Sequence, residues 1–176
     1  MTRRSAIEIK ATAYHEAGHG VACVVQGHPV KNLTVVPNAT SFGHYVRPSV
    51  RDYDCQTVSQ MRKVARELIL VCYAGWPAEQ RCNPDADEWR SKRDYDQAFN
   101  LSREFEVFPR SCTVVGDEFH QKYLAELKEK ARRLVRRHWN AVEALAAELL
   151  KRKTLDKDAI ERTVQPILVG IRRIAH

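Results

Sequence analysis

Two histidines four residues apart, His15 and His19, constrain this chain more than any other feature of its sequence. Residues at this spacing lie on one face of an α-helix, one turn apart, so both imidazoles reach a single metal ion. Glu16 follows the first histidine and projects beside such an ion, where its carboxylate takes a proton from metal-bound water. This stretch is typical of a zinc hydrolase, with His15 and His19 as ligands and Glu16 as general base.

Residues 11–26 form the predicted helix around these histidines. Gly27 ends it, and Pro29 follows shortly after. Ala13, Ala17 and Gly18 are small, and we expect them to leave space for a metal ion and a substrate. The alternative is a pair of histidines hydrogen-bonded in a core, with Glu16 in solvent.

The rest of the pattern predicts a mainly α fold with one small β-hairpin. Residues 30–37 alternate and are rich in β-branched side chains, and residues 42–47 are expected to pair with them after a turn at 38–41. Further helices are expected at 54–73 with Asp54 as the N-cap, from Pro77 to 81, from 94 to about 107, at 124–138, at 142–150, and as a short helix after Asp156. With 176 residues and no repeat or linker, the chain fits one domain, 1–176.

The net charge of +7 lies entirely in the C-terminal third. Residues 121–176 hold 14 Lys and Arg against 7 Asp and Glu, whereas residues 1–120 hold 15 of each. Arg132, Arg133, Arg136 and Arg137 are the densest part, and a solvated helix face explains such a group more often than a binding surface does. Aromatic residues among these arginines amount to little more than Trp139, so stacking support is thin and no nucleic-acid partner is expected.

The sequence also predicts where the protein resides. The longest apolar run, residues 68–75, is too short to span a membrane, and the basic start is not followed by the apolar stretch of a signal peptide. Five scattered cysteines without a C-x-x-C pair indicate reduced thiols. We therefore expect a cytoplasmic protein without a membrane span.

A third metal ligand is needed, because a catalytic zinc ion normally takes three protein ligands and leaves the fourth position to water. It is expected from a distant segment, and the candidate carboxylates are Glu79, Asp94 and Asp96. Glu79 and Asp94 lie at or near the starts of predicted helices, where the helix dipole stabilises an anion. Periodicity alone does not choose among the three.

Several segments together are similar to one known family. They are residues 12–19 around the histidines, 30–37, 74–80, 94–103, 149–150 and 155–160. In combination they resemble the peptidase domain of the FtsH family, the ATP-dependent zinc proteases, over nearly the whole chain. The resemblance implies a helical zinc metallopeptidase-like domain in which Asp94 is the third ligand. It also implies that Glu79 supports a ligand or replaces one, and that Asp96 is solvated.

The motif and the resemblance together predict a zinc-dependent endopeptidase that cleaves unfolded or extended polypeptides. The chain has no G-x-x-x-x-G-K stretch, so we expect any ATPase to act as a separate chain, and the family's six-fold rings make a homo-oligomer a further expectation. The alternative is a non-proteolytic zinc module that binds peptides or regulates a partner, suggested by Trp76 where the family has arginine. The strand at 33–37 either adds a peptide at its edge or serves as scaffold.

Overall fold

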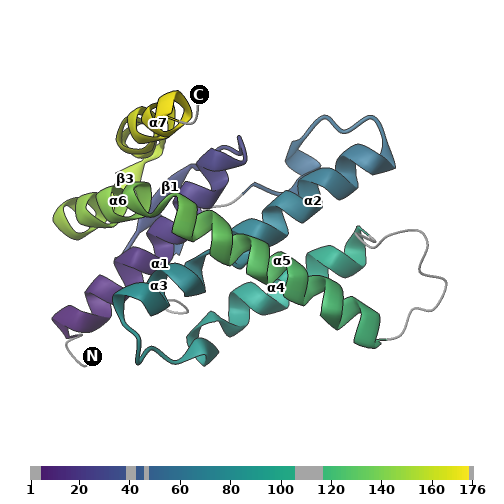
Figure 1. Ribbon diagram of the computed structural model, residues 1–176, viewed down its shortest axis with the longest axis horizontal. Coiled ribbons are helices and arrows are strands. Elements are labelled where there is room, and N and C mark those ends of the chain that lie inside the picture. Colours follow the sequence, from purple (N-terminus) through teal and green to yellow (C-terminus); the bar gives the residue numbers. More distant parts are fainter. Residues whose placement is uncertain (1–4, 39–42, 46–47, 106–116, 175–176) are drawn as a thin grey trace.

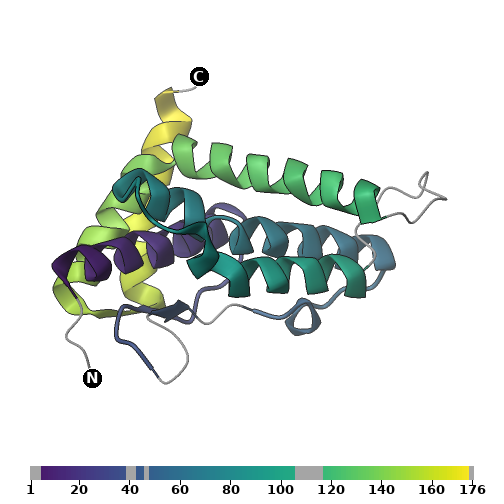
Figure 2. The same ribbon diagram turned by 90° about the horizontal axis from the view of Figure 1, so that it is seen from below.

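The computed structural model describes residues 5–38, 43–45, 48–105 and 117–174. Its elements are, in order, α1 (Ala6–Val25), β1 (Asn32–Thr34), β2 (His44–Tyr45), the 3₁₀ turn η1 (Val50–Asp52), α2 (Val58–Cys72), α3 (Gly75–Cys82), the 3₁₀ turn η2 (Glu88–Ser91), α4 (Lys92–Glu104), α5 (Asp117–Arg137), α6 (Trp139–Arg152), β3 (Thr154–Asp156) and α7 (Lys157–Ile174). The fold is mainly α, as predicted. Helices α6 and α7 gather with α1 at one end (Figure 1), and α5 runs over α2 and α4 at the other (Figure 2).

Helix α1 begins five residues earlier than predicted, because Ser5 caps it. The Ser5 hydroxyl accepts a hydrogen bond from the backbone N–H of Glu8 at 3.2 Å, and the Glu8 carboxylate accepts one from the Ser5 N–H at 2.8 Å. This reciprocal capping box satisfies two backbone donors that the first turn would leave unpaired. The predicted stop is confirmed: the helix ends at Val25, and Gly27 adopts a φ of +76°, which favours glycine.

The start of α2 also differs from the prediction. Thr57, and not Asp54, is the N-cap, since Thr57 and Gln60 exchange the two hydrogen bonds of a capping box. Helix α2 ends at Cys72, close to the predicted 73, and α3 begins at Gly75, two residues before the predicted Pro77. The last helix, α7, has 18 residues and is not short, although Asp156 does accept a hydrogen bond from the Ala159 N–H at 2.8 Å, as expected of its cap.

The predicted hairpin exists between β1 and β2, where Leu33 pairs with Tyr45 in antiparallel register. A third strand, β3, pairs with the other side of β1 and was not predicted. Neither edge of β1 is therefore open to a peptide strand, and the Val35 N–H just beyond it donates to the Lys153 carbonyl. Residues 39–41 of the predicted turn at 38–41, and the hairpin residues 42, 46 and 47, lie outside the described residues. Helix α4 ends at Glu104, short of the predicted 107.

Two hydrophobic cores hold the helices together. The first core lies around α1, the sheet, α6 and α7, with Leu33, Leu145 and Ile160 fully buried. The second core lies between α2, α4 and α5, around Leu68 and Leu127. The described cysteines, Cys23, Cys55, Cys72 and Cys82, are free thiols, and Cys112 lies outside the described residues. Within the described ranges, every helix falls short of the length or the apolar character that crossing a bilayer requires.

Candidate metal centre

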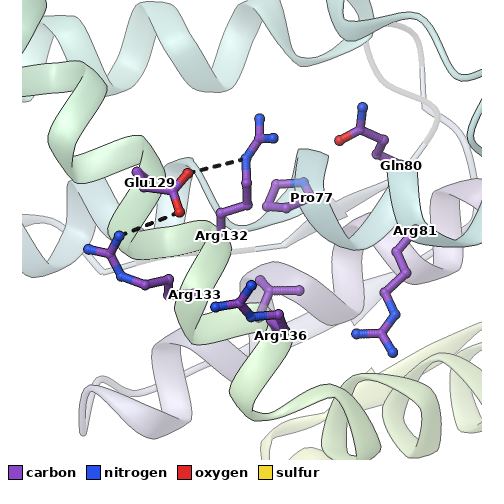
Figure 3. A pocket seen from close by; sticks show the side chains of 8 residues that line it. Pro77, Gln80, Arg81, Glu129, Arg132, Arg133 and Arg136 are labelled. Atoms are coloured by element: carbon purple, nitrogen blue, oxygen red, sulfur yellow. Dashed lines mark hydrogen bonds and ion pairs between the residues drawn. The ribbon is translucent and has the colours of Figure 1, made fainter.

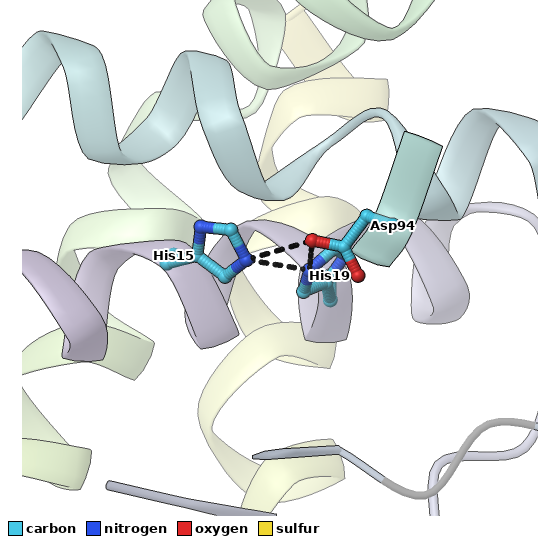
Figure 4. Close-up of side chains that lie close together, drawn as sticks. All are labelled: His15, His19 and Asp94. Carbon is cyan, nitrogen blue, oxygen red and sulfur yellow. Dashed lines mark hydrogen bonds and ion pairs between the residues drawn. The ribbon is translucent and has the colours of Figure 1, made fainter. Parts of the chain in front are cut away.

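Three side chains from two distant helices meet between the two cores. His15 and His19 project from α1, and Asp94 projects from the first turn of α4 toward them (Figure 4). The Nε2 atoms of the two histidines lie 3.0 Å apart, and Oδ2 of Asp94 lies 3.1 Å from Nε2 of His15 and 3.5 Å from Nε2 of His19. The structure thus brings together the three residues that the resemblance implied as ligands.

These separations have the dimensions of a tetrahedral metal site. Zinc binds imidazole nitrogen and carboxylate oxygen at about 2.0–2.2 Å, so that ligand atoms at the corners of a tetrahedron lie roughly 3.3–3.6 Å apart. The observed 3.0–3.5 Å is close to that spacing and needs only a small expansion. Three corners are then protein atoms and one is left for water or substrate, which is the pattern of a catalytic site.

The outer nitrogens of both histidines are already engaged, and this sets the chemistry of the inner ones. Nδ1 of His19 lies 2.8 Å from the Val71 carbonyl, which only accepts, so Nδ1 carries the proton. Nδ1 of His15 donates in the same way to Oε2 of Glu79 at 2.9 Å. When both rings are neutral, each therefore presents an Nε2 lone pair. Two lone pairs and a carboxylate oxygen that face one another repel unless a cation lies between them, so the donor set fits a metal ion.

Glu79 lies behind His15 and is almost completely buried, with 3% of its surface exposed. Its Oε2 accepts from His15, and its Oε1 lies 3.9 Å from Nε of Arg90. This contact orients the His15 ring and raises the basicity of its other nitrogen, as carboxylate partners of metal-bound histidines do. Asp96 is directed elsewhere: its carboxylate is 59% exposed and pairs with Lys92 at 2.6 Å.

Glu16 is buried next to the histidines, with 4% of its surface exposed. Its Oε2 has no hydrogen-bond partner among the described residues. Burial raises the pKa of Glu16 to about 7, against the lowering effect of positive charge on His15 and His19. A buried carboxylate oxygen that has no partner among the described residues, beside a candidate set of metal ligands, can accept a proton from a water molecule.

The electrostatics of the site call for positive charge. Without a metal ion in the site, the pKa of His15 is raised to about 10. Burial lowers this pKa, but the hydrogen bonds to Asp94 and Glu79 outweigh that effect. Burial raises the pKa of Asp94, but the neighbouring His19 and His15 hold this pKa well below its ordinary range. The carboxylates therefore draw either a proton or a cation to this point.

Glycine determines how closely the helices approach the site, but not at the predicted position. A Cβ at Gly18 would lie 2.5 Å from the Ala74 carbonyl oxygen, so Gly18 brings α1 against α3 and does not make room for a metal. Ala13 and Ala17 are likewise fully buried in the first core. Gly75 is the glycine that leaves space at the metal centre, because a Cβ there would lie 2.5 Å from Nε2 of His19. The only sequence signal for this role is that Gly75 lies in the segment 74–80, which carries part of the family resemblance.

Comparison with known proteins finds distant relatives. No protein-family model matches the chain. Over 178 residues it is 27% identical to the ATP-dependent zinc metalloprotease FTSH 9, chloroplastic/mitochondrial, of Oryza sativa, covering 90% of this chain and 22% of the rice protein. It is 28% identical over 186 residues to the ATP-dependent zinc metalloprotease FtsH of Thermus thermophilus, with 89% and 29% covered. This chain is a distant homologue of the FtsH zinc metalloproteases.

The homology extends to a Drosophila melanogaster FtsH relative, the ATP-dependent zinc metalloprotease YME1L, at 26% identity over 174 residues, covering 85% of this chain and 23% of the fly protein. The chain spans about a quarter of the length of these FtsH relatives. That coverage is consistent with their peptidase domain alone. These relatives are named zinc metalloproteases. Their name and the group of His15, His19 and Asp94 together suggest zinc as the metal.

Proposed function

We propose that this chain is a zinc-dependent endopeptidase that hydrolyses peptide bonds in unfolded or extended polypeptides. The observation that carries the proposal is the convergence of two Nε2 atoms and one carboxylate oxygen at 3.0–3.5 Å from one another. Homology to FtsH zinc metalloproteases supports both the metal and the class of substrate. On this proposal residues 1–176 form one zinc metallopeptidase-like domain.

In the proposed mechanism His15, His19 and Asp94 would hold the zinc ion, which when bound polarises the scissile carbonyl and makes a coordinated water more acidic. Glu16 accepts the proton of the attacking water at its buried carboxylate and passes it to the leaving amine. Glu79 and the Val71 carbonyl hold the two imidazoles in the tautomer that presents Nε2 inward. Burial excludes bulk water from Glu16 and raises its pKa to about 7, which favours uptake of a proton near neutral pH.

The test is cleavage of casein by the zinc-loaded protein. We expect activity that a chelator removes and added zinc restores. In Glu16→Gln the zinc content should stay the same, and the rate should fall about 10²- to 10⁴-fold, because a general base is lost. Glu118→Gln, the same change at an exposed position on α5, is the matched control and should leave the rate unchanged.

The same assay separates the peptidase from a non-proteolytic zinc module. Casein cleavage by Glu16→Gln at the wild-type rate would remove Glu16 from its proposed role. A zinc-loaded protein that binds casein fragments but never cleaves them would favour a module that presents peptides or regulates a partner.

A further inference from the structure

A pocket of about 230 Å³ between α3 and α5 carries a surplus of positive charge. Residues of α3 line one side and residues of α5 the other (Figure 3). The lining comprises Pro77, Gln80 and Arg81 from α3, and Glu129, Arg132, Arg133, Val135 and Arg136 from α5. The lining holds four arginines and a single carboxylate, which gives the pocket a net charge of +3.

Pairing inside the pocket leaves much of this charge uncompensated. Glu129 lies 3.4 Å from Arg133 and 3.9 Å from Arg132, and all three side chains are about half exposed. Arg136 makes neither an ion pair nor a hydrogen bond with any residue that the structure describes. The guanidinium carbon of Arg81 lies 4.2 Å from the centre of the Trp139 ring. Stacking occupies the face of that guanidinium and leaves its N–H edge available to an anion.

A solvated helix face explains only part of this arrangement. Basic residues in the last turn of a helix are stabilised by its dipole, which accounts for Arg136 and Arg137 at the end of α5. It does not account for Arg81, which reaches the same pocket from another helix. Nor does it account for Arg132, which lies four residues before Arg136 on α5, a spacing at which like charges repel.

We propose that this pocket binds a phosphate group, either as the free anion or on a small phosphorylated molecule. Guanidinium groups match the geometry of phosphate oxygens and bind them with paired hydrogen bonds. The volume of about 230 Å³ is below the roughly 300–1,000 Å³ typical of sites for larger small molecules, so it suits one compact anionic group. A phosphate dianion would offset most of the net charge and relieve the repulsion among the arginines.

This site is separate from the metal centre, and it does not rest on the proposed peptidase activity. Glu79 of α3 is buried against His15, whereas Gln80 and Arg81 of the same helix are exposed toward the pocket. Binding is therefore measurable without any substrate turnover.

The experiment is calorimetric titration of inorganic phosphate into the full chain at constant ionic strength, balanced with chloride. We expect one saturable site, and affinity about tenfold weaker in Arg136→Gln and in Arg81→Gln, which remove one charged donor from each side. Arg137→Gln is the matched control, because it removes the same charge one residue further along α5 and outside the pocket lining. Its affinity should stay within about twofold of wild type, since a bound anion would touch no group that it removes.

A conservative variant and a second ligand test whether a loss of binding comes from misfolding and identify the source of the phosphate. Arg136→Lys keeps the charge but loses the paired donors, so it should weaken binding by less than Arg136→Gln. Ribose 5-phosphate binding more tightly than inorganic phosphate would assign a phosphorylated small molecule, and equal or weaker binding would assign the free anion. Equal losses in the Arg136→Gln and Arg137→Gln proteins, phosphate affinity no greater than that for chloride, or binding confined to a single-stranded oligonucleotide would overturn the proposal.

Discussion

Helices α1 and α4 both point ligand atoms at the metal centre, but they are held in place in different ways. Helix α1 has 20 residues, a capping box at Ser5, and buried residues along most of the stretch that bears His15 and His19. Helix α4 has 13 residues, has no side-chain cap at Ser91, and buries only Ala98, Leu101 and Ser102. The two histidines are therefore aligned by the helix that carries them, whereas Asp94 reaches them only because α4 packs against α2 in the second core. A metal ion in this site would join the two cores.

The largest effect that distinguishes the two helices is expected from Asp94→Asn. The amide is a weaker, uncharged ligand, so the affinity for zinc should fall at least about 100-fold, more than the usual effect of losing a supporting group. Asp96→Asn removes the same charge two residues along α4, where the carboxylate is exposed and paired with Lys92, and should change the affinity less than about twofold. Competition with a chromophoric chelator measures both. Equal losses in the two variants would mean that α4 acts only through its overall charge.

The packing that fixes α1 is tested by Gly18→Ala. A Cβ there would lie 2.5 Å from the Ala74 carbonyl oxygen, so α1 and α3 must separate, and the free energy of unfolding should fall by about 1–3 kcal/mol. Gly170→Ala is the control, because among the described residues a Cβ at that helical position would meet no atom within 4 Å outside the helix's own backbone. It should raise the stability by roughly 0.5–1 kcal/mol. Urea denaturation of the metal-free proteins gives both values, and unchanged stability in the Gly18 variant would contradict the close contact.

A smaller effect is expected from Glu79→Gln, which keeps an acceptor for Nδ1 of His15 but removes the charge. Zinc affinity should fall about tenfold, the lower end of the range for groups that support a metal ligand. Glu104→Gln changes an exposed carboxylate at the end of α4 and should have no effect. A loss as large as that in Asp94→Asn would make Glu79 a ligand itself, the alternative that the resemblance left open.

The smallest effect concerns a contact between the end of α1 and α2 that needs no metal. His28 follows α1, and its Nδ1 lies 2.7 Å from the hydroxyl oxygen of Tyr53. Its Nε2 lies 3.4 Å from Oε2 of Glu67 on α2. Burial lowers the pKa of His28 below its ordinary 6.5, so the unfolded chain takes up a proton more readily than the folded protein. Stability should therefore be lost as the pH falls through 6.5.

Thermal unfolding at pH 7.5 and 5.5 measures this loss, and the difference from His28→Gln isolates it from other histidines. Burial also raises the pKa of Glu67, which keeps this neighbour from fully compensating a charged imidazole. Equal acid sensitivity in the wild type and the variant would remove His28 from this role. Greater wild-type stability at the lower pH would show that the imidazolium pairs with Glu67.

Features encoded locally were predictable from the sequence, and those that depend on packing were not. The alignment of His15 with His19 and the pairing of β1 with β2 follow from periods of four and two over short stretches. The pairing of Thr34 with Thr154 joins residues 120 positions apart, and no local sequence pattern predicts it. Spacing likewise left three carboxylates open as the third ligand, because only the packing of α4 decides which one reaches the histidines.

Two errors in the element boundaries have a different origin, because the capping signals that decide them are local. Asp54 and Thr57 are both good N-caps, and the choice fell to Thr57 because Gln60 completes its capping box. At the start of α1 the same local signal, Ser5 followed by Glu8, marks the true first turn five residues before the predicted one. The role of Gly75 depends on how closely α3 approaches α1, which is a property of the folded core.

The most direct measurement of the central claim is X-ray absorption spectroscopy at the zinc edge, combined with elemental analysis of wild type and Asp94→Asn. We expect one zinc per chain with two imidazole nitrogens and carboxylate or water oxygens at about 2.0–2.2 Å, and loss of the metal from the variant. A zinc-free protein, a thiolate at about 2.3 Å, or an unchanged spectrum and zinc content in Asp94→Asn would contradict it.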